Sequence, residues 1–262
     1  MGGAGGSSGD SGIPTGNEDK CDGIDNDNNG IIDDVDVGKD GICDCLRIAT
    51  LGKQGTVGVS NVFTGWLDAR SSTGTADLDD AVLTPTLLSQ YQVIVAQNVS
   101  VNHTYDANEV AALKAWIDAG GGLMTLIGYA DPSEIQNVNT LLGPYGMSYG
   151  PEQILQKSGA STVPVTNWVP HPVTNGVSLL GVDNGYPVKG VGTVLATEQG
   201  WEMLLVQTVK QGRVAMWGDE WITFDSEWAG HPEYQVELFW LNTIKWLTPA
   251  NNCQVPIPPP VK

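Results

Sequence analysis

Two kinds of hydrophobic pattern alternate along the chain from residue 46 onward. Short continuous apolar runs, typical of strands buried on both faces, occur at Leu46–Leu51, Gln92–Ala96 and Leu123–Ile127. Between them lie segments whose apolar residues recur three or four positions apart, which predicts helices. Strand, helix, strand and helix joined by short links predict right-handed crossovers and a parallel sheet covered on both faces.

The predicted helices have recognisable ends. One helix is expected over residues 59–67. Asp106 and Glu109 have the spacing of a capping box and open a second helix, which the glycines at 120–122 end. A third helix is expected over Pro132–Leu142.

The second half of the chain adds shorter β segments and a last helix. Residues 143–200 are richer in Gly and Pro, and a hairpin is expected around the turn at 210–212. The expected elements are strands at Val177–Val182, Thr193–Thr197, Met203–Val209 and Arg213–Trp217, and a helix at Glu233–Leu247.

Length and charge limit the classes of protein that fit. The 262 residues, 41% of them apolar, support one sizeable α/β domain with a small appendage. The net charge is −18, and residues 1–45 alone hold 11 acids and 2 bases. So acidic a surface repels phosphate backbones and anionic lipids, so we expect no nucleic-acid partner. No apolar run is long enough to span a membrane.

An acidic loop near the start of the chain has the ligand spacing of a calcium site. Calcium takes six to eight oxygens at about 2.4 Å, and carboxylates on alternate residues reach one ion only if the chain turns sharply at a glycine. The predicted ligands, at positions 1, 3, 5, 7, 9 and 12 around Gly30, are Asp25, Asp27, Asn29, the Ile31 carbonyl, Asp33 and Asp36. No amphipathic helix precedes the loop, so an EF-hand is not expected. The alternative is a solvated acidic linker.

A weaker second copy of the loop follows. Asp36, Asp40 and Asp44 stand at its positions 1, 5 and 9, and Gly38 replaces its third ligand. The stretch from Cys21 to Asp34 resembles the Asp-rich, cysteine-flanked metal-binding repeats of secreted bacterial proteins, and also thrombospondin type-3 repeats. This resemblance implies calcium as the bound ion.

The cysteines lie only at the two ends of the chain, at Cys21, Cys43, Cys45 and Cys253. Three pairings are possible. We favour a pairing in which either Cys43 or Cys45 joins Cys21 and the other joins Cys253. A zinc site competes, but Cys43 and Cys45 lack the two-residue gap of a zinc knuckle.

A location outside the cytoplasm is expected from these features. Disulfides and calcium are typical of an oxidising compartment. The Gly/Ser-rich stretch at 2–16 is similar to the tethers that follow the lipidated cysteine of bacterial lipoproteins. We therefore expect a secreted or lipid-anchored protein at the cell surface.

Four stretches between Leu46 and Leu247 have a family texture: Ala115–Leu123, Asn139–Gly143, His171–Val177 and Gly212–Asp219. With the order of elements around them, they resemble the class I glutamine-amidotransferase-like superfamily, whose sheet is flavodoxin-like. In its catalytic members a cysteine nucleophile occupies the turn after the central strand. Here that turn carries Tyr129 and Ala130, and the family's later His-x-Glu pair is absent. The resemblance implies the fold without the amidotransferase chemistry.

Carboxylates and aromatic rings alternate after the last expected strand, where open α/β sheets place their ligand crevices. The carboxylates are Asp219, Glu220, Asp225 and Glu227, and the aromatic residues are Trp217, Trp221, Phe224 and Trp228. Three interpretations stay open: a solvated acidic loop, a sugar-binding platform, or a carboxylate-pair hydrolase. Tyr129 and His103 complete the candidate ligand-binding residues, because both follow strands that end at the same crevice.

These patterns together predict four segments and one function. The segments are a tether at 1–17, a calcium-binding segment at 18–45, an α/β domain at 46–248, and a Pro-rich tail at 249–262 that contains Cys253. The expected function is that of a calcium-binding, non-catalytic module for binding or assembly. Its expected partners are extracellular polysaccharide or cell-surface components. The alternative is a carbohydrate-active hydrolase that uses the Asp219–Glu227 loop.

Overall fold

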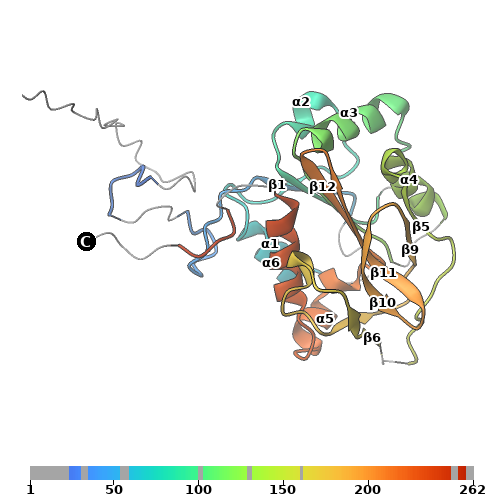
Figure 1. The fold of residues 1–262 in the computed structure, drawn as a ribbon. Helices are drawn as coiled ribbons and strands as arrows, with labels where there is room; N and C mark the ends of the chain where they lie inside the picture. Colours follow the sequence, from blue (N-terminus) through green and yellow to red (C-terminus); the bar gives the residue numbers. More distant parts are fainter. Residues whose placement is uncertain are drawn as a thin grey trace, which may run out of the picture.

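A computed structural model describes residues 24–30, 35–53, 59–99, 103–128, 132–159, 162–248 and 253–257. Its main feature is an eight-stranded sheet in the order β2-β1-β3-β4-β12-β11-β10-β7 (Figure 1). In that order the strands are Ala76–Asp77, Ile48–Leu51, Val93–Ala96, Gly122–Leu126, Gly212–Trp217, Trp201–Val209, Thr193–Glu198 and Asn167–Trp168. Two short ladders pair β5 (Met147–Tyr149) with β9 (Val188–Gly190) and β6 (Val163–Val165) with β8 (Leu180–Val182).

The sheet changes direction at β12. The five strands from β2 to β12 are parallel, with Ile48 opposite Val93 and Gly122 opposite Arg213. The three strands from β11 to β7 continue the sheet in antiparallel pairs. The expected mixed α/β fold with a large, mostly parallel sheet is therefore confirmed.

Helices cover both faces of the sheet because both faces of its strands are apolar. Along β1, Ile48 joins the core under α1 and α6, whereas Ala49 and Leu51 join the core under α2, α3 and α4. Figure 1 shows these helix groups on separate sides of the sheet. The α-helices are α1 (Asn61–Asp68), α2 (Pro85–Leu88), α3 (Ala107–Asp118), α4 (Pro132–Leu142), α5 (Asp225–Gly230) and α6 (Val236–Leu247), and the 3-10 turns are η1 (Gly143–Tyr145), η2 (Pro172–Thr174) and η3 (Trp221–Thr223).

Most of the predicted elements form where the sequence pattern places them. The capping box of Asp106 and Glu109 opens α3, and α4 has the predicted bounds. The last helix differs, since it begins at Val236 and not at Glu233. The Tyr234 amide donates to the His231 carbonyl, so a turn occupies the residues expected to form the first helical turn.

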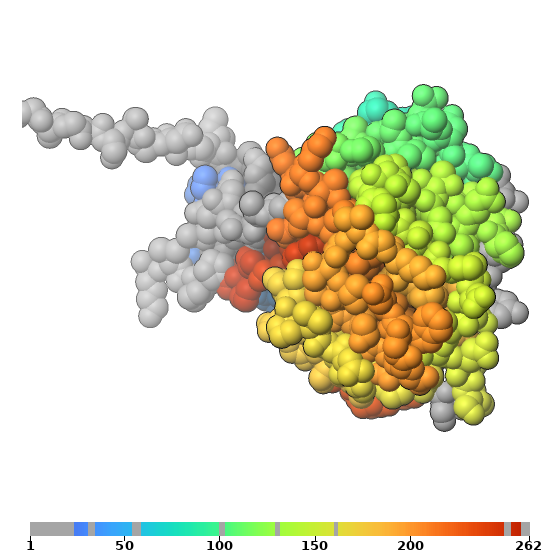
Figure 2. All heavy atoms as spheres, turned by 45° about the vertical axis from the view of Figure 1, so that its right-hand side comes forward, coloured from blue at the N-terminus to red at the C-terminus, as the bar shows by residue number. Residues whose placement is uncertain are grey.

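The acidic segment and the C-terminal segment lie on the same side of the domain (Figure 2). Residues 253–257 run beside 41–43, with the Cys43 amide 2.8 Å from the Val255 carbonyl oxygen and the Gln254 amide 2.7 Å from the Cys43 carbonyl oxygen. Cys45 and Cys253 form a disulfide, which decides between the two favoured pairings. Cys43 is also disulfide-bonded, and its predicted partner Cys21 lies outside the described residues. Within the described ranges, no helix is long and apolar enough to cross a membrane.

Candidate metal loops and the end of the sheet

The first loop spans residues 25–36, and over the described residues 25–30 its own side chains turn the chain. The two carboxylate oxygens of Asp25 accept from the amides of Asn29, at 3.1 Å, and Gly30, at 2.9 Å. Asp27 also accepts from the Asn29 amide, at 3.0 Å, and from its side-chain nitrogen. Gly30 has a φ of +90°, which a side chain would disfavour. Of the predicted ligands, Ile31 and Asp33 lie outside the described residues.

The second loop, residues 36–44, repeats this backbone eleven residues later. The carboxylate of Asp36 accepts from the amides of Asp40 and Gly41, both at 2.9 Å, as Asp25 does in the first loop. The left-handed residues also correspond, since Lys39 (φ +56°) matches Asn28 (φ +59°) and Gly41 (φ +77°) matches Gly30. Oxygens of Asp36, Asp40 and Asp44 lie within 4.8 Å of one another, as in a metal site.

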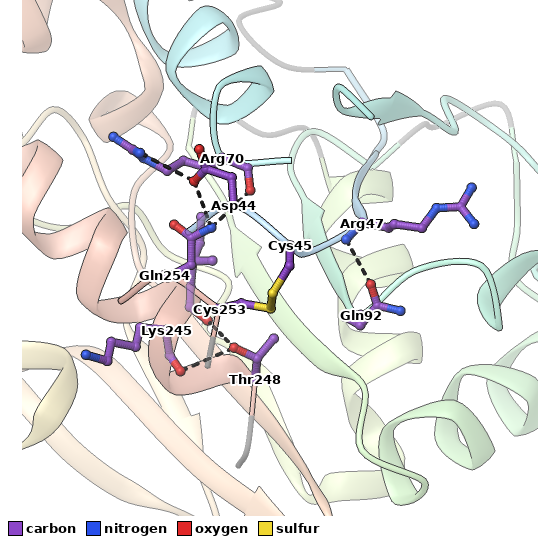
Figure 3. Close-up of a disulfide and its surroundings, with 10 residues drawn as sticks. Asp44, Cys45, Arg47, Arg70, Gln92, Lys245, Thr248, Cys253 and Gln254 are labelled. Carbon is purple, nitrogen blue, oxygen red and sulfur yellow. Dashed lines mark hydrogen bonds and ion pairs between the residues drawn. A yellow bond between two sulfur atoms is a disulfide. The ribbon is translucent and has the colours of Figure 1, made fainter. Parts of the chain in front are cut away.

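A cation of the domain already reaches the second loop. Arg70, which follows α1 and is only 4% exposed, ion-pairs with Asp40 and places Nη1 3.5 Å from Asp44 Oδ1 (Figure 3). Its guanidinium also lies 5.2 Å from the centre of the Trp66 ring. The hydrogen bond from Arg70 lowers the pKa of Asp40, whereas burial raises the pKa of Asp44.

Asp44 has two further partners, one in its own loop and one in the C-terminal segment. Its carboxylate accepts from the Gly38 amide at 3.1 Å and from Gln254 Nε2 at 3.2 Å. Gln254 Nε2 also donates to the Arg70 carbonyl oxygen at 3.1 Å, beside the Cys45–Cys253 disulfide (Figure 3). Sequence reasoning missed both Arg70 and Gln254, because no local pattern distinguishes them.

The carboxylates predicted after β12 are mostly buried. Asp219 is 1% exposed and accepts from the amides of Asp183, at 2.6 Å, and Trp221, at 3.1 Å. Glu227 is fully buried and accepts from the Gly181 amide at 3.2 Å. Burial raises the pKa of both carboxyl groups well above their ordinary values. Glu220 is also buried and accepts from Gln97 Nε2 at 3.1 Å.

Asp225, the fourth of these carboxylates, serves a neighbouring helix. It accepts from the Val62 amide at 2.8 Å, in the first turn of α1, where the N-cap residue Ser60 makes no side-chain bond of its own. The cavity lined by Asp219 and Glu220 measures about 100 Å³, below the roughly 300 to 1,000 Å³ of small-molecule sites. The four carboxylates therefore hold structural positions, and their geometry does not favour a hydrolase.

The aromatic residues predicted for the same crevice pack into the interior. Trp217 is fully buried and Trp221 is 7% exposed. Trp228 packs 6.0 Å from Phe63 and 5.7 Å from Trp66, between ring centres. Phe224 is half-buried at the edge of the 100 Å³ cavity. These rings form no open platform among the residues described.

His103 and Tyr129 complete the predicted ligand-binding residues. His103 Nε2 lies 2.8 Å from Glu109 Oε1, and the His103 carbonyl accepts from Asn137, so this histidine fastens the start of α3. Tyr129 lies outside the described residues.

A larger groove lies at the other end of the strands, beside the amino-terminal ends of β3, β4 and β12. Its volume is about 860 Å³. The half-buried rings of Tyr91 and Trp116 line it together with Gln211 and Arg213. The sequence analysis did not single out this groove, because its residues come from four separate elements.

Comparisons with known proteins show the fold and no family. No protein-family model and no curated protein matches the sequence. Among solved structures, "mmIFT52 N-terminal domain" matches with a TM-score of 0.59 at 14% identity, covering 78% of this chain and 97% of that one. "Cytoplasmic Protein STM1381 from Salmonella typhimurium LT2" matches with a TM-score of 0.59 at 15% identity, covering 78% and 100%. "Cytoplasmic Protein STM3548 from Salmonella typhimurium" matches with a TM-score of 0.55 at 14% identity, covering 78% and 99%.

These matches correct two expectations. The neighbours are not glutamine-amidotransferase-like proteins, so that resemblance was wrong. Short stretches of a βα unit recur in many α/β proteins and do not define a family. Two neighbours are described as cytoplasmic proteins, which points away from the secreted or lipid-anchored location, and we withdraw it. Disulfides and a Gly/Ser stretch are only statistical markers of a compartment.

Proposed function

We propose that this protein is a calcium-binding, non-catalytic module for binding or assembly, with a flavodoxin-like arrangement of its parallel strands as the scaffold. The first loop is its ion site. The observation that carries the proposal is the carboxylate of Asp25, whose bonds to the amides of Asn29 and Gly30 turn the chain as a calcium loop requires.

Calcium would act on this loop by charge. Asp25, Asp27 and Asn29 are half-exposed or exposed, and residues 1–45 hold 11 acids against 2 bases, so their oxygens repel one another. A bound divalent ion offsets that repulsion and ties fold stability to ion concentration. At a free concentration of 100 times Kd, binding stabilises the folded state by about 2.7 kcal/mol.

The experiment is a metal analysis with a melting curve, on protein purified without chelator. We expect bound calcium, a melting temperature lowered by EDTA, and recovery on adding calcium. Asp25→Asn/Asp27→Asn should abolish both the bound ion and the EDTA effect. Glu152→Gln, an exposed charge removed elsewhere, is the matched control and should keep both. A chelator-free preparation without calcium, and with a melt indifferent to EDTA, sinks the proposal.

The groove of Tyr91 and Trp116 is the surface that we propose for a polymeric ligand. Its aromatic walls and polar Gln211 and Arg213 suit a neutral polysaccharide, in which apolar ring faces alternate with hydroxyl groups. Retention on immobilised neutral polysaccharides tests this. Trp116→Ala should lose retention, whereas Trp201→Ala, at a 41% exposed ring outside the groove, should keep it. Equal retention of both variants would contradict this assignment.

A further inference from the structure

We propose that the Arg70 guanidinium is the built-in cation of the second loop. The acidic segment then takes a single calcium ion, in the first loop, while the second loop is fastened to the domain without a metal. This inference deepens the proposed calcium function and, in its ion count, rests on it.

The two loops differ in their side chains, although their described positions have the same backbone conformation. In each, the carboxylate at position 1 accepts from the amides at positions 5 and 6, and the residues at positions 4 and 6 are left-handed. At position 3, however, the first loop carries Asp27 and the second carries Gly38. The second loop therefore keeps the turn of an ion site but lacks one of its ligands.

The missing ligand has a steric explanation. A Cβ atom at Gly38 would lie 3.3 Å from Arg70 Nη1 and 3.2 Å from the Ala69 carbonyl oxygen. A carboxylate at position 3 would have to extend into the space that the guanidinium occupies. Gly38 thus leaves space for the Arg70 guanidinium. The same glycine accounts both for the missing carboxylate ligand and for the arginine in its place.

Arg70 also contacts the residues that an ion would contact. It pairs with Asp40 at position 5 and Asp44 at position 9. Both Arg70, at 4% exposure, and Asp44, at 0%, are buried, and a buried charge requires a partner of opposite sign. A calcium ion in the same place would bring two further positive charges against a fixed guanidinium, which disfavours a second ion.

The consequence is a division of labour between the loops. Arg70 holds the second loop on the domain beside Gln254 and the Cys45–Cys253 disulfide (Figure 3), whatever the calcium concentration. The first loop alone responds to calcium. Chelation by EDTA should therefore destabilise the first loop and leave the contacts of the second loop with Arg70 in place.

Calcium stoichiometry, measured by elemental analysis and by calorimetric titration with calcium alone, tests the inference. The full chain should bind one equivalent. Gly38→Asp/Arg70→Met, which supplies the missing carboxylate and removes the cation, should bind two. Arg70→Lys, which keeps a positive charge, should remain at one. Asp25→Asn/Asp27→Asn should bind none, but one when combined with Gly38→Asp/Arg70→Met.

Each outcome separates this inference from the calcium function itself. Two equivalents in the unmodified chain would overturn the role of Arg70 and leave the calcium function standing. No ion in the unmodified chain but one in Gly38→Asp/Arg70→Met would overturn the calcium function and leave the role of Arg70 standing. A double variant that melts cooperatively yet gains no ion overturns the inference. If that variant does not fold, Arg70→Met is titrated with calcium instead. Its melting temperature should fall in EDTA, and it should rise on adding calcium by more than that of the unmodified chain. Equal responses of the two proteins to calcium would overturn the inference.

Discussion

Asp44 and Asp219 are two buried aspartates that the molecule treats differently. Asp44, the last residue of the second loop, has the Arg70 guanidinium and the Gln254 amide as partners. Among the described residues, Asp219, after β12, accepts from the backbone amides of Asp183 and Trp221 and lies near the negative charge of Glu220. Burial raises the pKa of Asp44, but it raises that of Asp219 well above the ordinary value. Burial thus favours the protonated form of Asp219, whereas Asp44 has a cation beside it.

This difference places the stronger response to pH at the end of the sheet. The charge near Asp44 is fixed by an arginine that stays protonated at any ordinary pH. The region after β12 instead contains Asp219 and Glu227, whose negative charges disfavour each other. We expect the end of the sheet to be sensitive to pH and the acidic segment to be sensitive to ions.

The largest effect is expected from removing the covalent tie of the acidic segment. Cys45→Ala/Cys253→Ala opens a link between residues that are 208 positions apart. The loss should be about 2 to 5 kcal/mol in free energy of unfolding, since the crosslink restricts the unfolded chain. Urea unfolding at pH 7 measures it. Unchanged stability would mean that Arg70 and Gln254 hold the segment by themselves.

A smaller effect, of opposite sign, is expected at the other region. The pKa of Glu227 is raised by burial, so the folded chain keeps its proton above the ordinary value of 4.5. The stability that this carboxyl contributes is complete below that pH and is lost as pH rises through the folded pKa. Glu227→Gln should therefore be more stable than the unmodified chain at pH 8, by about 1 to 3 kcal/mol.

The pH series supplies its own control. Near pH 4 the two proteins should unfold at similar urea concentrations, and their difference should grow toward pH 8. Glu152→Gln, at an exposed carboxylate, should show no such trend. A Glu227→Gln variant that becomes less stable than the unmodified chain as the pH rises would show that the charged form is the native one.

The smallest effect concerns Asp225, whose carboxylate caps the first turn of α1. Asp225→Ala removes the acceptor for the Val62 amide and should cost about 0.5 to 2 kcal/mol, as the loss of a helix cap does. Asp225→Asn keeps an acceptor oxygen and should cost less. Thermal melting measures both, and equal losses would argue against capping.

Local pattern was sufficient for the central strands of the sheet and for several of its helices. The capping box at Asp106, the bounds of α4 and the buried runs of β1, β3 and β4 depend on neighbours in sequence, so they could be read in advance. The turn of the first loop belongs here too, because Asp25 bonds residues four and five positions away. The family resemblance failed because the same local patterns serve many α/β folds.

The sequence by itself determined the alternating strands and helices, the −18 charge, and the glycine register of the two loops. Only the tertiary structure decided that Arg70 pairs with the second loop, that Cys45 and not Cys43 pairs with Cys253, and that Asp225 caps α1. The contacts in question join residues 26, 208 and 163 positions apart. Helix periods, caps and turns are set by interactions across a few residues, whereas the partner of a buried charge is set by where the packed elements bring it.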